Sequence, residues 1–192
     1  MTPIQSPGSL DCAITAFAQR EAFPANRFSE KDLQQLATTV NGTWNTYWRV
    51  DAEALVLVPD LTWKANPAAV NALEQDTIYR RLTLSEGAAG HVWRSRKPVW
   101  TLDLMNDMCL PRSLDAQRGG LQGGLWFAIK SNQAVYGVME ILGAALVHPD
   151  HSLLLAVEHL GMVLGDLVEK GRSTRHDDDL FTSTSKTFCE WS

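Results

Sequence analysis

Two apolar runs in the second half of the chain, GLWFAI (residues 124–129) and AVYGVMEIL (residues 134–142), flank the polar tip KSNQ (residues 130–133). Apolar runs of this length on both sides of a short polar tip are typical of a β-hairpin whose strands are buried. We therefore predict that these two runs form the central strands of a sheet.

Further strand signals lie closer to the N-terminus. The aromatic and β-branched residues between Trp44 and Val50, followed after the break DAE by LVLV (residues 55–58), predict a second hairpin. Residues 99–102 indicate one more short strand. A long connection over residues 105–122 follows it, with a helical turn predicted at 113–117, and a connection this long usually has a function.

Helical patterns surround these strands. Residues 10–23 predict a first helix, and Ser29 as N-cap with Asp32 in the first turn predicts a second one that ends at Gly42. Residues 67–81 and, most strongly, residues 149–169 repeat apolar side chains at helical spacing. This order of elements supports an α+β fold with a central antiparallel sheet of about five or six strands.

The composition excludes several classes of protein. The chain has 192 residues, a formal net charge of −5 and scattered basic residues, so it offers nucleic acid no basic track. Three widely spaced cysteines favour free thiols in a reducing cytosol. The first ten residues lack a signal-peptide pattern, and no apolar run approaches the length of a bilayer span. We expect a cytoplasmic protein without a membrane span.

Five blocks of the sequence, in this order, resemble the successive blocks of a GAF domain, the sensory domain of bacterial sensor histidine kinases and other signalling proteins. They are WNTYWRVD (44–51), GAAGHVWRSRKPVWTLDL (87–104), DMCLPRSLDAQRGGLQGGLWFAI (107–129), YGVME (136–140) and PDHSLLLAVEHLGMVLG (149–165). The resemblance implies terminal helices on one face of the sheet, and loops with short helices forming a pocket on the other. It divides the chain into an N-terminal segment (1–28), a sensory domain (29–171) and a polar tail or linker (172–192).

The pocket implied by the resemblance has seven candidate lining residues: Trp63, Trp93, Trp100, Cys109, Arg112, Trp126 and Glu140. Most of the tryptophans fall on or beside predicted strands, where large aromatic side chains commonly fill a core, so we expect only one or two of them to line a pocket. Arg112 can fork onto a ligand anion or onto Asp107 or Asp115, and we favour an internal bridge that shapes the pocket mouth.

Cys109 lies in DMCL (107–110), which resembles a thiol motif of bilin-binding GAF domains. No second cysteine follows before Cys189, and the segment between Leu110 and Leu125 is too short for the chromophore-bearing helix of those proteins. A GAF-type methionine sulfoxide reductase also uses loop cysteines, but no resolving thiol is apparent within the domain. We favour Cys109 as a small, partly buried residue that carries no adduct.

No catalytic set or metal site can be assembled from the sequence. Five histidines lack zinc-site spacing: His91, His148, His151, His159 and His176. The glycines of GGLQGG (119–124) lead into a strand, so they indicate a turn and no pyrophosphate cradle.

Residues 149–169 carry two apolar stripes. One consists of Leu153, Val157, Leu160, Leu164 and Leu167, and the other of Leu154, Gly161, Gly165 and Val168. Two stripes predict two packing partners, and the three-four repeat of the first favours the seam of a homodimer. The alternative is a monomer in which the N-terminal helix covers the second stripe.

These inferences together predict a non-catalytic sensory or regulatory domain. It would bind a small molecule or a protein and act through its terminal helices on an output kinase or cyclase domain or protein, with the ligand and any cofactor unknown. The alternatives are a bilin or haem photoreceptor or gas sensor and a thiol-dependent enzyme similar to methionine sulfoxide reductase.

Overall fold

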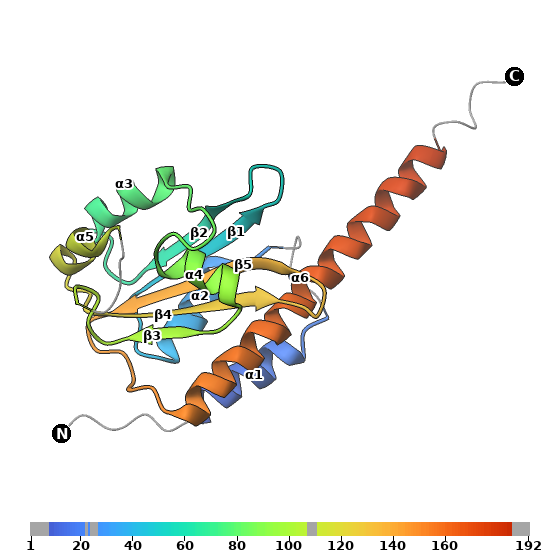
Figure 1. Cartoon of the computed structure of the whole chain (residues 1–192). Coiled ribbons are helices and arrows are strands. Elements are labelled where there is room, and N and C mark those ends of the chain that lie inside the picture. Colours follow the sequence, from blue (N-terminus) through green and yellow to red (C-terminus); the bar gives the residue numbers. More distant parts are fainter. Residues whose placement is uncertain (1–7, 22, 24–26, 107–110, 186–192) are drawn as a thin grey trace, which may run out of the picture.

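A five-stranded antiparallel sheet, in the order β2-β1-β5-β4-β3, forms the centre of the computed structural model (Figure 1). The structure describes residues 8–21, 23, 27–106 and 111–185, with backbone only for 8, 9 and 173–185. The strands are β1 (Trp44–Asp51), β2 (Val56–Lys64), β3 (Val99–Thr101), β4 (Gly123–Lys130) and β5 (Val135–Gly143). The predicted α+β class and antiparallel sheet are confirmed.

The hairpin of β4 and β5 lies inside the sheet, as the two apolar runs predict. Its register pairs Gly123 with Gly143 and Trp126 with Glu140. Almost every residue of both strands is buried, because helices cover both faces of the sheet. Period-two alternation therefore sends neighbouring side chains of one strand into two different cores.

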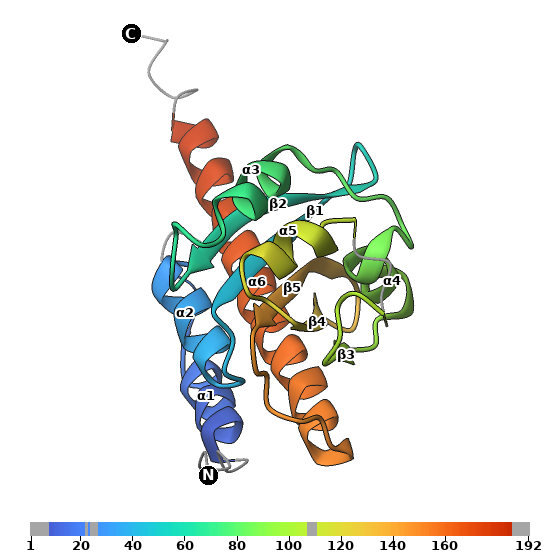
Figure 2. The same ribbon diagram turned by 90° about the vertical axis from the view of Figure 1, so that its left-hand side faces the viewer.

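Three helices cover one face of the sheet, here called the helix face: α1 (Gly8–Ala18), α2 (Glu30–Thr38) and α6 (His151–Ser185) (Figure 2). The predicted cap of α2 is confirmed, since the Ser29 hydroxyl accepts from the Asp32 backbone N–H and the Asp32 carboxylate accepts from the Ser29 N–H. α6 lies directly on β4. A Cβ at Gly161 would come 2.2 Å from the Ala128 carbonyl oxygen, and one at Gly165 would come 2.0 Å from that of Lys130.

Short helices cover the opposite face, here called the loop face. They are α3 (Asn71–Tyr79), α4 (Gly87–Ser95) and α5 (Ser113–Arg118). α3 begins four residues after Pro67, the predicted first helical residue, because residues 67–70 form a turn. The two faces enclose separate apolar cores, one under α1, α2 and α6 and the other under α3, α4 and α5.

The residues predicted to form the dimer seam are wrong, because they pack within the domain itself. Val157, Leu160, Leu164 and Leu167 are 0–3 % exposed within this single chain, and Leu153 packs against the same core. Their partners are the sheet and α1, which contacts α6. The second stripe, with Gly161 and Gly165, faces β4. The domain thus covers both stripes itself.

The long helix α6 differs from its sequence prediction in two further respects. It continues to Ser185, beyond the predicted end at Glu169, and leaves the body of the domain (Figure 1). By length and composition alone, the part His151–Arg172 could cross a membrane, which corrects the expectation that no apolar run approaches this length. Four of its apolar side chains, Val157, Leu160, Leu164 and Leu167, are buried in the helix-face core, so the domain itself accounts for part of this composition.

Candidate functional site

Arg112 lies at the N-terminal end of α5 and points into the loop-face core, where it is 1 % exposed. Its Nη2 donates to both carboxylate oxygens of Glu140, at 2.9 and 2.8 Å. Its Nη1 donates to the Thr77 hydroxyl at 2.6 Å, and the guanidinium carbon lies 5.0 Å from the centre of a Trp48 ring. The predicted internal bridge of Arg112 therefore exists, but with a different partner.

Glu140 is the anionic centre of the site. It lies on β5, is fully buried, and accepts a third hydrogen bond from the Trp126 indole N–H at 2.8 Å. Trp126 is its cross-strand neighbour on β4, so sheet register brings the two together. We call Trp48, Thr77, Arg112, Trp126 and Glu140 the Arg112–Glu140 cluster. It ties α3 and α5 to the three central strands.

At the centre of the Arg112–Glu140 cluster is an ion pair that is buried from solvent. A buried carboxylate needs both a counter-ion and hydrogen bonds. For Glu140, Arg112 is the cation and donates two hydrogen bonds, and the Trp126 indole donates a third. Thr77, which accepts from Arg112, itself donates to the Leu73 carbonyl at 2.6 Å. The polar groups of Thr77, Arg112, Trp126 and Glu140 are thus satisfied within the cluster and its helix, and they offer no activated nucleophile.

Two indole N–H groups in the same core are not satisfied in this way. Trp44 and Trp48 are fully buried on β1, and their Nε1 atoms have no hydrogen-bond partner among the described residues. A buried donor without an acceptor costs free energy, so such groups mark places where a polar molecule could be accepted. They are the strongest indication of ligand binding within the loop-face core.

The six predicted pocket residues that the structure describes separate into two groups. Arg112, Trp126 and Glu140 meet in the Arg112–Glu140 cluster, and Trp93 packs against the same core from α4. Trp63 and Trp100 instead pack against the helix-face core, so their assignment to this pocket is wrong. The reason is strand alternation, since Trp100 is paired with Leu125, whose side chain also faces the helices. Cys109 lies outside the described residues.

The carboxylates expected to pair with Arg112 have other positions. Asp115 pairs with Arg118 at 3.2 Å on the surface of α5, and Asp107 lies outside the described residues. Sequence reasoning missed Thr77 and Trp48 as members of the cluster. Alternation along β1 could have placed Trp48 with Trp44 on one face, whereas nothing in the sequence around Thr77 points to Arg112.

A cavity of about 370 Å³ lies beside α5, the helix that begins next to Arg112. The cavity is between the segment that follows β3 and the turn before β4. Asp103, one of its lining residues, accepts hydrogen bonds from the Asn106 side chain and from the backbone of Met105 and Asn106. The bond from the Asn106 side chain is the largest cause that lowers the pKa of Asp103. The carboxylate therefore organises its own turn.

Comparison with known proteins shows the fold but no close relative. Neither a protein-family model nor a curated protein sequence matches the chain. Among solved structures, the GAF domain of the Acinetobacter phosphoenolpyruvate-protein phosphotransferase is similar with a TM-score of 0.62 and 13 % identity, over 92 % of this chain and 99 % of that one. The corresponding GAF domain from Coxiella burnetii gives 0.61 and 14 %, over 88 % and 95 %.

An enzyme has the same architecture. The free methionine-R-sulfoxide reductase of Neisseria meningitidis, solved in complex with its substrate, is similar with a TM-score of 0.63 and 15 % identity, over 86 % of this chain and 89 % of that one. The chain therefore has the GAF fold that its sequence blocks predict. Identities this low establish the fold alone, and the fold is shared by regulatory domains and enzymes.

Proposed function

We propose that this chain is a non-catalytic regulatory domain that responds to a small molecule or protein partner and transmits the response through α6, in the cytoplasm. The observation that carries the proposal is the position of α6. Gly161 and Gly165 seat it on the backbone of β4, and the same strand contributes Trp126 to the Arg112–Glu140 cluster on the opposite face. One strand thus separates the cluster from a helix that continues to Ser185.

The loop-face core supports the binding part of the proposal. The unpartnered indole N–H groups of Trp44 and Trp48 would suit a ligand with hydrogen-bond acceptors. Such a ligand would contact β1 beside the Arg112–Glu140 cluster and bias the packing of α3 and α5. An output kinase or cyclase domain, in this chain's partner or in a longer polypeptide, would receive the signal from the end of α6.

Amide hydrogen exchange tests the coupling between the two faces. Arg112→Lys keeps the charge but loses the fork that joins Glu140 to Thr77, so α3 and α5 should exchange faster. If β4 transmits this loosening, residues 157–168 of α6 should also exchange faster, while Arg118→Lys on the surface of α5 should change neither. Faster exchange in α5 with unaltered exchange in α6 would refute transmission through β4.

The enzyme alternative requires its own measurement. The likeness to the methionine-R-sulfoxide reductase motivates an assay of free methionine-R-sulfoxide reduction with a dithiol reductant. We expect no turnover. Activity that is lost in Cys109→Ser, with Cys12→Ser as the matched exposed-thiol control, would replace the regulatory proposal with a catalytic one. An absorbance spectrum of the purified protein tests the bilin and haem alternatives, for which we expect no visible band.

A homodimer remains part of the proposal, with different contact residues. Leu155 and Met162 lie seven residues apart on α6 and are 54 % and 38 % exposed, so they form an outward stripe. We expect Leu155→Glu to shift the protein to a monomer in light scattering without loss of its folded state. A wild type that is already monomeric at micromolar concentration would exclude this seam.

A further inference from the structure

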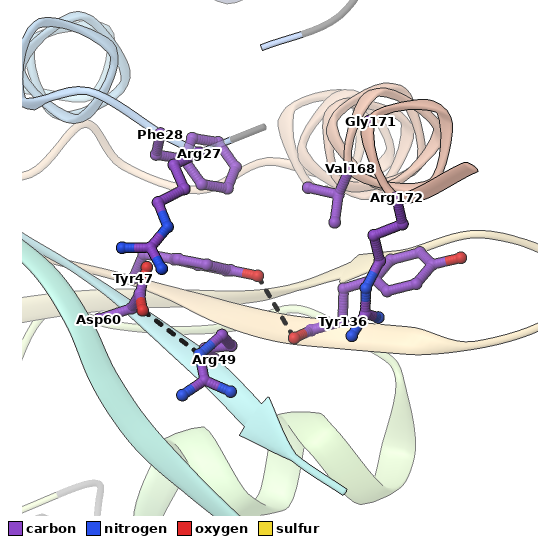
Figure 3. A pocket seen from close by; sticks show the side chains of 9 residues that line it. All are labelled: Arg27, Phe28, Tyr47, Arg49, Asp60, Tyr136, Val168, Gly171 and Arg172. Atoms are coloured by element: carbon purple, nitrogen blue, oxygen red, sulfur yellow. Dashed lines mark hydrogen bonds and ion pairs between the residues drawn. The ribbon is translucent and has the colours of Figure 1, made fainter. Parts of the chain in front are cut away.

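A cavity of about 240 Å³ opens on the helix face, where α6 leaves the sheet (Figure 3). It is separate from the loop-face core, because the sheet lies between them. Its lining comes from the segment before α2, from strands β1, β2 and β5, and from α6. The lining residues are Arg27, Phe28, Tyr47, Arg49, Asp60, Tyr136, Val168, Gly171 and Arg172.

The charge of this lining is opposite to that of the whole chain. Three of the nine residues are arginines and one, Asp60, is acidic, so the lining carries a formal charge of +2 in a protein of net charge −5. Asp60 accepts from Arg49 Nε at 3.3 Å. In Figure 3, Arg27 and Arg172 extend from the helix side and Arg49 from the sheet. The guanidinium groups therefore approach the cavity from different sides.

The wall between these arginines is aromatic. Tyr47 and Tyr136 are 5 % and 8 % exposed, Phe28 packs on Tyr47 with ring centres 4.6 Å apart, and the Arg172 guanidinium lies 5.5 Å from the Tyr136 ring centre. Burial raises the pKa of both tyrosines, so neither phenol adds a negative charge at neutral pH. A further acid, Glu169, lies outside the lining and is hydrogen-bonded to Tyr136.

We propose that this cavity binds a small phosphate monoester with an aromatic or apolar group. A dianionic phosphoryl group balances the +2 charge of the lining, and guanidinium forks are the preferred partners of phosphate oxygens. The aromatic wall of Phe28, Tyr47 and Tyr136 accepts the apolar part. The ligand would join Arg49 on β1 to Arg172 on α6. The inference does not depend on the loop-face ligand or on the regulatory role.

Titration calorimetry with phenyl phosphate as the probe tests this site. For a ligand of this size we expect a dissociation constant of about 1 mM or tighter. Inorganic phosphate should bind at least about tenfold more weakly, because it lacks the group that contacts the aromatic wall, and phenol should not bind. Phosphate that binds as well as phenyl phosphate, or the absence of saturable binding of phenyl phosphate, would overturn the proposal.

Substitutions of charged lining residues test whether phenyl phosphate binds in this cavity, because removal of an arginine and removal of the aspartate should change its affinity in opposite directions. Arg49→Gln and Arg172→Gln should each weaken phenyl phosphate about tenfold or more, since each removes a charged hydrogen-bond donor. Asp60→Asn should tighten it, because it removes the one acidic side chain of the lining. Arg118→Gln, an exposed arginine on α5, is the matched control and should have no effect. Equal effects of Arg118→Gln and Arg172→Gln, or weaker binding by Asp60→Asn, would refute this location.

Discussion

Glu140→Gln is the sharpest perturbation of the loop-face core. The substitution keeps the shape of the side chain and the acceptor for Trp126, but it leaves the Arg112 guanidinium, 1 % exposed, without a counter-ion. Removing one partner of a buried ion pair commonly costs about 3–5 kcal/mol. A domain of this size has a free energy of unfolding of about 5–15 kcal/mol, so the variant should lose a large part of its stability.

A double variant separates the ion pair from packing. Arg112→Met in the Glu140→Gln background removes the orphaned charge and retains much of the volume, so the double variant should be more stable than Glu140→Gln alone. Asp115→Asn breaks the exposed pair with Arg118 and should cost only about 0–1 kcal/mol.

Urea unfolding followed by tryptophan fluorescence measures these differences, since Trp48 and Trp126 lie in the cluster itself. A loss below about 1 kcal/mol for Glu140→Gln would show that Arg112 is hydrated and that the ion pair does not hold the core. A double variant that is less stable than Glu140→Gln would show that the guanidinium stabilises the core without its carboxylate.

Three further predictions concern other parts of the chain. Burial alone would raise the pKa of Asp32, but its hydrogen bonds with Ser29 and Arg20 outweigh burial and lower it. Asp32→Asn should therefore destabilise the protein at pH 7. The difference in free energy of unfolding between the variant and the wild type should shrink as the pH falls below 3.8, the ordinary pKa of an aspartate, and urea unfolding at pH 7 and below pH 3.8 measures this change. Gly165→Ala should lower the melting temperature, because its Cβ would lie 2.0 Å from the Lys130 carbonyl oxygen, and overpacking of this kind costs about 1–3 kcal/mol or more; an unchanged melting temperature would contradict the seating of α6 on β4. Intact mass spectrometry should find no adduct, and extra mass that disappears in Cys109→Ser would show a bound group.

Local sequence patterns sufficed for most of the elements. The hydroxyl of Ser29 and the carboxylate of Asp32 cap α2 through contacts that span three residues, and the two apolar runs around residues 130–133 pair through one short turn. Such features depend on hydrogen bonds and periodicities within a few residues, so they can be recognised without knowledge of the rest of the fold. The GAF fold was predicted in a different way, from the resemblance of five sequence blocks, in their order, to those of GAF domains.

Pairings between distant residues were decided by tertiary structure alone. Arg112 had two acidic neighbours in sequence, yet its partner is Glu140, 28 residues away, because sheet register and the position of α5 bring them together. Trp100 lies on a three-residue strand, which is too short to reveal its phase, and pairing with Leu125 turns it to the helix face. The stripes of α6 likewise show that it has two partners, whereas only the packed chain shows that both belong to the same domain. Periodicity determines which residues of an element share a face, and the energetics of packing the whole chain determine what that face meets.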